Sequence, residues 1–136
     1  MDEKHLNELN QQFINQRQYV RTLEGGILEI TTPFLDALND SIQLYLIDFG
    51  DDGFLLTDDG YTMWDLEASG YVFDEKDIAR YTTRHSQITI KLQGDRFNVH
   101  VLNQANVAHQ VFRMAACLSE LSKGIAFEHI QKKGSE

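Results

Sequence analysis

Acidic side chains gather around the expected loops in the first half of this chain. They are Glu29, Asp36, Asp40, Asp58, Asp59, Asp65 and Glu67. Carboxylate oxygens are the ligands that Mg²⁺, Mn²⁺ and Ca²⁺ prefer, so a set that converges in space could serve a metal-dependent hydrolase or nuclease. The set expected for such a site is Glu29, Asp40, Asp58 and Asp59, with Mg or Mn as the metal. The competing interpretation is structural, because Asp also binds backbone N–H groups in turns and at helix starts.

A second chemical interpretation combines carboxylates with aromatic rings. The residues are Asp36, Asp40, Asp58, Asp59, Tyr61 and Trp64. Acidic and aromatic side chains on neighbouring turns are typical of a surface that binds a protein partner. We take this as the leading hypothesis: a non-enzymatic interaction or regulatory module that needs no cofactor. For Trp64, Tyr61, Tyr71 and Phe73, however, packing in the core is the commoner use of such rings.

Other catalytic and metal-binding patterns are not found in the sequence. The five histidines (His5, His85, His100, His109 and His129) lack zinc-ligand spacing, and the two Asp–Gly turns are too short for an EF-hand loop. No phosphate-binding loop, dinucleotide fingerprint or nucleophile elbow follows a strand. The single cysteine, Cys117, falls at helical spacing with Met114 and Leu121, which predicts a buried, unreactive thiol.

Length and charge bound the classes of protein that remain. The 136 residues fit one domain, with a core over about residues 18–125 and a polar tail from residue 129, and the net charge is −9. That charge disfavours binding to nucleic acid or to an anionic membrane and favours a basic partner. It also leaves open a third hypothesis, an anti-defence protein that imitates nucleic acid. No signal peptide or long apolar run is seen, so we expect a cytoplasmic protein.

Hydrophobic periodicity predicts an α+β fold. Expected strands cover residues 18–24, 27–32, 41–49, 54–57, 87–92 and 96–102, with Pro33 ending the second. The expected N-terminal and C-terminal helices cover residues 2–17 and 104–123, and the second of two short inserted helices covers residues 74–83. We expect a mainly antiparallel sheet of about five strands covered by the long C-terminal helix, which Gly124 ends. The N-terminal helix carries Leu6, Leu9 and Phe13 on one face, so it should dock on its own sheet or form a homodimer.

The stretch from residue 54 to residue 70 connects a strand, a turn and a short inserted helix. Asp59-Gly60 forms the expected turn, and Thr62 with Asp65 has the spacing of a capping box. Ser69-Gly70 is expected to end the helix. These assignments leave Asp58 without a local role, so Asp58 with Glu29 and Asp40 is where a site would be sought.

Several ordered motifs together resemble a known family. They are residues 28–36 (LEITTPFLD), Asn39-Asp40 with residues 42–45 (IQLY), residues 56–62 (LTDDGYT) and residues 65–70 (DLEASG). These motifs are similar to domain of unknown function 1828, a bacterial and phage family, over about residues 18–125. The resemblance implies a compact intracellular domain associated with prophages or mobile elements, here expected as the stand-alone form. It implies no catalytic residues.

Overall fold

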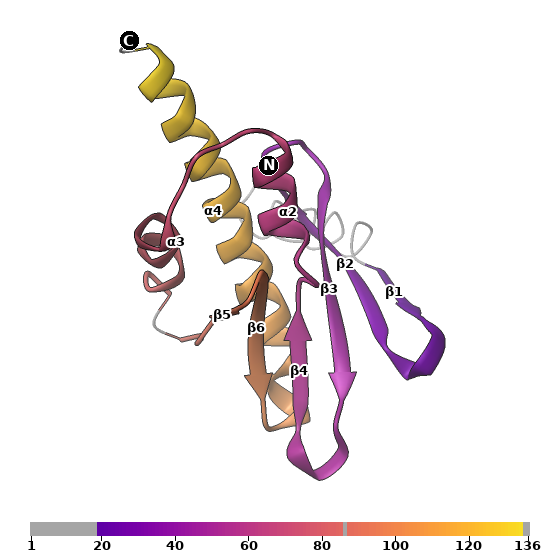
Figure 1. The fold of residues 1–136 in the computed structure, drawn as a ribbon. Coiled ribbons are helices and arrows are strands. Elements are labelled where there is room, and N and C mark those ends of the chain that lie inside the picture. Colours follow the sequence, from indigo (N-terminus) through magenta and orange to yellow (C-terminus); the bar gives the residue numbers. More distant parts are fainter. Residues whose placement is uncertain (1–18, 86, 135–136) are drawn as a thin grey trace, which may run out of the picture.

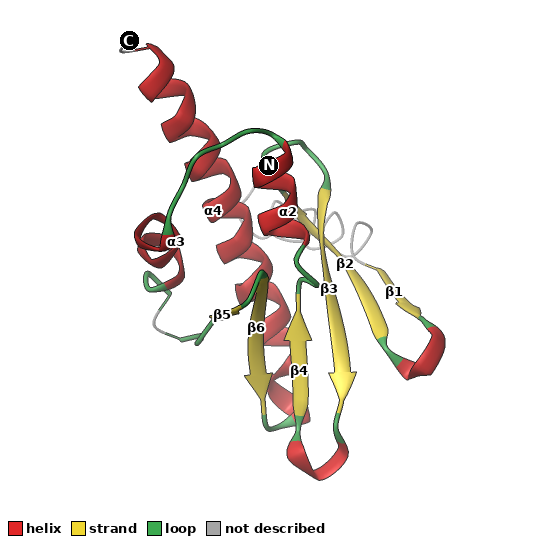
Figure 2. Cartoon of the chain, in the orientation of Figure 1, coloured by secondary structure: helices red, strands yellow, loops and turns green. Residues whose placement is uncertain are grey.

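The computed structural model describes residues 19–85 and 87–134. Its sheet has six strands rather than about five, all neighbours are antiparallel, and their order is β1-β2-β3-β4-β6-β5. The strands are β1 (Tyr19–Thr22), β2 (Leu28–Leu35), β3 (Ser41–Asp48), β4 (Phe54–Thr57), β5 (Lys91–Gln93) and β6 (Arg96–Val101). The helices are α2 (Tyr61–Ala68), α3 (Glu75–Thr82) and α4 (Val107–Gly134) (Figures 1 and 2). The α+β class predicted from the sequence is confirmed.

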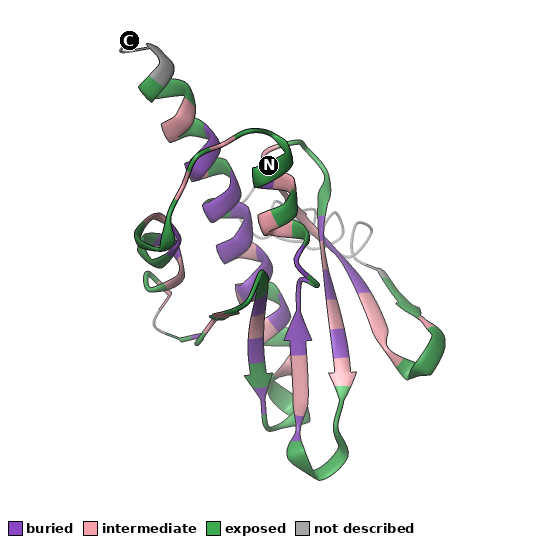
Figure 3. Ribbon diagram, viewed as in Figure 1, coloured by how far each residue is buried: buried purple, intermediate pink, exposed green. Residues whose placement is uncertain are grey.

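The core lies between one face of the sheet and helix α4. Alternate residues of the strands point to this face, among them Leu44, Leu56 and Phe97, which have no exposed surface. The same helix contributes Met114, Leu118 and, likewise unexposed, Cys117. Buried residues therefore follow the strands and the length of α4 that crosses them (Figure 3). Burial raises the pKa of the Cys117 thiol to about 12, as expected for an inert cysteine.

Strand β2 continues past Pro33, contrary to the prediction that proline would end it. The register between β2 and β3 shifts between Thr31 and Leu35, which is the signature of a β-bulge. Proline has no N–H to donate, and a bulge is one of the few places where a sheet tolerates it. The hydroxyl of Thr32 donates to the carbonyl of Ile42 at 2.7 Å and bridges the interrupted pairing.

Two predicted boundaries on the C-terminal side are also wrong. Of the expected strand over residues 87–92, only Lys91 and Leu92 pair with a neighbour, as part of β5, although Ile88 is still buried. Helix α4 passes through Gly124 and continues to Gly134, so residues 129–134 are helical and not a frayed tail. The expected helix over residues 2–17 lies outside the described residues. No helix in the described part of the chain has the length and apolar character to cross a membrane.

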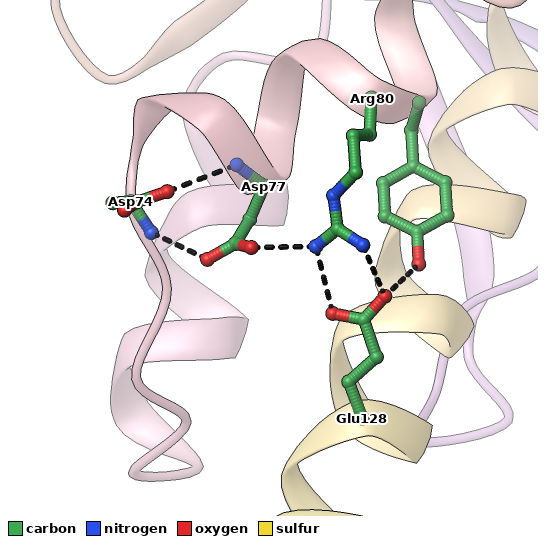
Figure 4. A network of polar contacts seen from close by, with 5 residues as sticks. Asp74, Asp77, Arg80 and Glu128 are labelled. Atoms are coloured by element: carbon green, nitrogen blue, oxygen red, sulfur yellow. Dashed lines mark hydrogen bonds and ion pairs between the residues drawn. The ribbon is translucent and has the colours of Figure 1, made fainter.

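The glycine at position 124 allows α3 to approach α4 closely. A Cβ atom there would lie 2.1 Å from the Tyr81 hydroxyl oxygen, well inside van der Waals contact. The same hydroxyl donates to Glu128 at 2.9 Å, and Glu128 also pairs with Arg80 at 2.9 Å (Figure 4). At the start of α3, Asp74 and Asp77 form a reciprocal capping box, which confirms the predicted cap at Asp74. Tyr81 is therefore fixed in position when it meets Gly124.

Replacing Gly124 by alanine should destabilise the protein despite the better helix propensity of alanine. The added methyl overlaps a tethered tyrosine, and overpacking of this kind costs about 1–3 kcal/mol, against about 1 kcal/mol gained from propensity. Urea unfolding of G124A measures the net effect, with K123A on the exposed side of the same helix as the control. A G124A protein as stable as the control would contradict the close packing of α3 on α4.

Candidate functional site: an acidic pocket beside helix α2

Asp58 joins β4, β6 and α2 through one buried carboxylate. Its side chain is only 1% exposed. One oxygen, Oδ1, accepts the backbone N–H of Gly60 at 3.0 Å and that of Phe97 at 2.9 Å. The other oxygen, Oδ2, accepts the N–H of Thr62 at 3.1 Å. A buried charge is tolerated when hydrogen bonds replace water, and three N–H donors do so here.

This arrangement replaces the capping box that the sequence predicted from Thr62 and Asp65. Gly60 occupies the N-cap position of α2 with φ of 86°, and glycine has no side chain that could accept a hydrogen bond from the helix. The free N–H groups of the first turn are instead met from outside the helix by Asp58, two residues before the cap. Glycine is required at residue 60 because this left-handed conformation strains any residue that has a Cβ.

A pocket of about 440 Å³ opens between α2 and the turn that joins β2 to β3. We call it the acidic pocket; its walls include the carboxylates of Asp36, Asp40 and Asp65 and the aromatic rings of Tyr61 and Trp64. Trp64 is 64% exposed and Tyr61 is 54% exposed. The remaining described lining residues are small, polar or aliphatic, and none is Lys, Arg or His. The pocket is therefore negative and has aromatic walls.

The β2–β3 turn fixes one side of the acidic pocket. Asp36 Oδ1 accepts the N–H groups of Leu38 at 2.8 Å and of Asp40 at 3.0 Å, which closes the turn on itself. Ser122 on α4 accepts the N–H of Ala37 at 3.0 Å and ties the turn to the helix behind it. The carboxylates of the turn are thus held in place relative to α2, which carries the other wall.

Asp65 is the carboxyl group most affected by the acidic pocket. Burial, then the charges of Asp36 and Asp40, and then a hydrogen bond with the Asp36 carboxyl raise the pKa of Asp65 above its usual 3.8. Each of these influences disfavours the ionised form of Asp65. A cation in the pocket would have the opposite effect, because it would offset the repulsion among the three carboxylates.

The outer face of the sheet extends from the same region. Tyr45 lies there opposite Glu29 in the β2–β3 register, and burial, followed by the charge of Glu29, raises the pKa of Tyr45 to about 12. Glu29 itself forms an ion pair with Arg21 at 3.0 Å. Asp59 pairs with Arg96 at 3.4 Å at the turn before α2. Both acidic residues therefore have basic partners, whereas among the described residues no ion pair is formed by Asp36, Asp40 or Asp65.

The structure brings together four of the six residues predicted for partner binding. Asp36, Asp40, Tyr61 and Trp64 line the acidic pocket, whereas Asp59 lies at the turn and Asp58 is buried beneath it. The set predicted for a metal site is separated, since of its members Glu29, Asp40, Asp58 and Asp59 only Asp40 lines this pocket. Among the described residues, no group of three or more His, Cys, Asp or Glu side chains could hold a metal ion.

Sequence reasoning missed Asp65 as a pocket residue. Its spacing predicts a helix cap, although its i, i+4 spacing from Tyr61 places both on one helix face. The competing interpretation, packing in the core, does not hold for Tyr61 and Trp64, because both are exposed. Tyr71 and Phe73, by contrast, pack at the edge of the core.

Comparison with family models decides the affiliation of the chain. Residues 32–121 match the model described as "Domain of unknown function DUF1828". The chain belongs to this family. The matched range includes every carboxylate of the acidic pocket, both aromatic walls and Asp58. Neither the curated proteins nor the solved structures include a significant match to the chain.

Replacing Asp58 by asparagine should destabilise the fold by about 1–3 kcal/mol, because the amide NH₂ would face the Thr62 N–H and leave it unsatisfied. The measurement is the free energy of unfolding in urea. D59N is the matched control, since Asp59 lies next in the chain, is half exposed and has only a surface ion pair. Equal stability of D58N and D59N would show that Asp58 does not hold the junction.

Replacing Asp65 by asparagine should stabilise the protein at neutral pH. Because the pKa of Asp65 is raised on folding, the native state binds more protons than the unfolded state between pH 3.8 and that raised pKa. Wild-type stability therefore falls as pH rises through this window, and the advantage of D65N should vanish below it. Thermal unfolding at several pH values tests this, with D51N on an exposed turn as control. A pH-independent difference would refute the assignment.

Proposed function

We propose that this protein is a non-enzymatic interaction module that accepts a basic side chain of a protein partner in the acidic pocket. The observation that supports this proposal is the composition of the pocket. Three carboxylates and two exposed aromatic rings line it, and none of the described residues that line it is basic. Elsewhere on the described surface, Glu29, Asp59 and Glu128 each pair with an arginine of the same chain.

The chemistry of the acidic pocket suits a guanidinium or ammonium group. Carboxylates accept charge-assisted hydrogen bonds, and a guanidinium can donate two of them in parallel to one carboxylate. The exposed ring of Trp64 offers a face for cation–π contact, which is strongest for tryptophan. The net charge of −9 would also speed the encounter with a basic partner.

The raised pKa of Asp65 should make the proposed binding depend on pH. In the free protein, the raised pKa of Asp65 reflects burial and repulsion by Asp36 and Asp40. A bound cation would favour the ionised carboxylate, so binding should lower this pKa and release a proton when the pH is near the raised pKa of free Asp65. We therefore expect binding to weaken on acidification.

No observation favours the two other functions considered from the sequence. A metal-dependent hydrolase or nuclease would need its acidic residues to converge, and Glu29, Asp40, Asp58 and Asp59 do not line one pocket. A protein that imitates nucleic acid would present carboxylates in a row across one face. Here the carboxylates of Asp36, Asp40 and Asp65 are gathered in a concave site instead.

The chain has a single tryptophan, so Trp64 fluorescence reports directly on the acidic pocket. The probe is a short Gly/Ser peptide with one arginine, compared with the same peptide carrying citrulline, a neutral isostere of arginine. We expect the arginine peptide to change Trp64 emission in a saturable, salt-sensitive way. D40N should weaken binding by roughly two- to fivefold, as for one exposed ion pair.

The control variant is D51N, which removes the same charge from an exposed turn outside the acidic pocket. It should bind the arginine peptide as the wild type does. Equal responses to the arginine and citrulline peptides would contradict recognition of a basic side chain. Equal weakening by D40N and D51N would show that only the overall charge matters.

A further inference from the structure

The three carboxylates of the acidic pocket are not equally available to a ligand. Asp36 Oδ1 already accepts two backbone N–H groups, and the Asp36 carboxyl also forms a hydrogen bond with Asp65. Asp40 differs, because the described residues supply no hydrogen-bond donor and no basic partner to its carboxylate. Asp40 is also exposed to solvent. It is therefore the carboxylate of the pocket that is most open to a bound group.

The backbone of Asp40 is nevertheless fixed. Its N–H donates to Asp36 Oδ1 at 3.0 Å, and its carbonyl oxygen accepts the N–H of Asp36 at 2.9 Å. The N–H of Ala37 in the same turn donates to Ser122 of α4 at 3.0 Å. A group that is already held in place loses less conformational freedom when it binds, so more of the interaction energy appears as affinity. Asp40 thus offers both carboxylate oxygens from a preorganised turn.

The wall formed by α2 adds a flat aromatic face to this carboxylate. Trp64 is largely exposed there and lies one residue before Asp65, which lines the same pocket. A guanidinium is planar, stacks on aromatic rings and is weakly hydrated, whereas the ammonium of lysine is compact and strongly hydrated. A guanidinium can therefore use both features at once, with its plane on the ring and its N–H groups on the carboxylate.

We infer that the acidic pocket selects arginine over lysine and that Asp40 determines this selectivity. The inference rests on the proposed function and narrows its ligand to a guanidinium group. Two parallel N–H groups of the guanidinium donate to the two oxygens of Asp40, while its plane stacks on Trp64. Asp65 supplies a second negative charge. Lysine provides the positive charge but cannot form the paired hydrogen bonds.

Titration with two matched basic peptides tests the selectivity. The Gly/Ser peptide with one arginine is compared with the same peptide carrying lysine, and Trp64 fluorescence reports binding of each. The wild type should bind the arginine peptide roughly three- to fivefold more tightly, as expected for one exposed bidentate pair. D40N should weaken binding of arginine more than binding of lysine and bring this ratio close to one. The control D51N should leave the ratio unchanged.

The outcomes separate this inference from the proposed function. Equal affinities of the wild type for arginine and lysine would overturn the selectivity and leave recognition of a basic side chain intact. A ratio that D40N leaves as it is in D51N would overturn the role of Asp40. If neither basic peptide binds better than the citrulline peptide, the proposed function fails together with the inference. The comparison of arginine with lysine uses the wild type, so it decides the selectivity even if D40N folds poorly.

Discussion

The burial of the Asp58 carboxylate is the constraint on which the rest of the structure depends. A charge that is 1% exposed must find partners in the protein, and all of those recorded are backbone N–H groups of β6 and of the first turn of α2. Satisfying them fixes where α2 begins relative to the sheet. The direction of α2 in turn sets where Tyr61, Trp64 and Asp65 lie, and therefore the shape of the acidic pocket.

The carboxylates in and beneath the acidic pocket thus have different physical roles. Asp58 and Asp36 bind backbone N–H groups and shape turns, whereas Asp40 and Asp65 contribute charge to the acidic pocket. Asp65 is held in a place that disfavours its own ionisation. Residues that lower stability in this way are common at functional sites.

The sequence predicted the elements better than it predicted their ends or the site. Strand alternation identified β3 and β6, and the capping residue Asp74 identified the start of α3. The predictions that Pro33 ends β2 and that Gly124 ends α4 are wrong because tertiary contacts override local preference. A β-bulge accommodates the proline, and the close approach of Tyr81 requires glycine at position 124. Asp58 could not be assigned from local spacing, since one of its partners, Phe97, lies 39 residues away. Local spacing likewise could not show that Asp36 and Asp65 form a hydrogen bond with each other in the acidic pocket.

The central claim is that the acidic pocket accepts a basic side chain of a protein partner. Its most direct test is a structure of this protein bound to a captured partner. The account predicts that an arginine or lysine side chain of the partner lies in the acidic pocket, between the ring of Trp64 and the carboxylates of Asp40 and Asp65. In the predicted complex, the hydrogen bonds from backbone N–H groups to the Asp58 carboxylate are also unchanged. A partner that contacts another face and leaves the acidic pocket open to solvent would contradict the account.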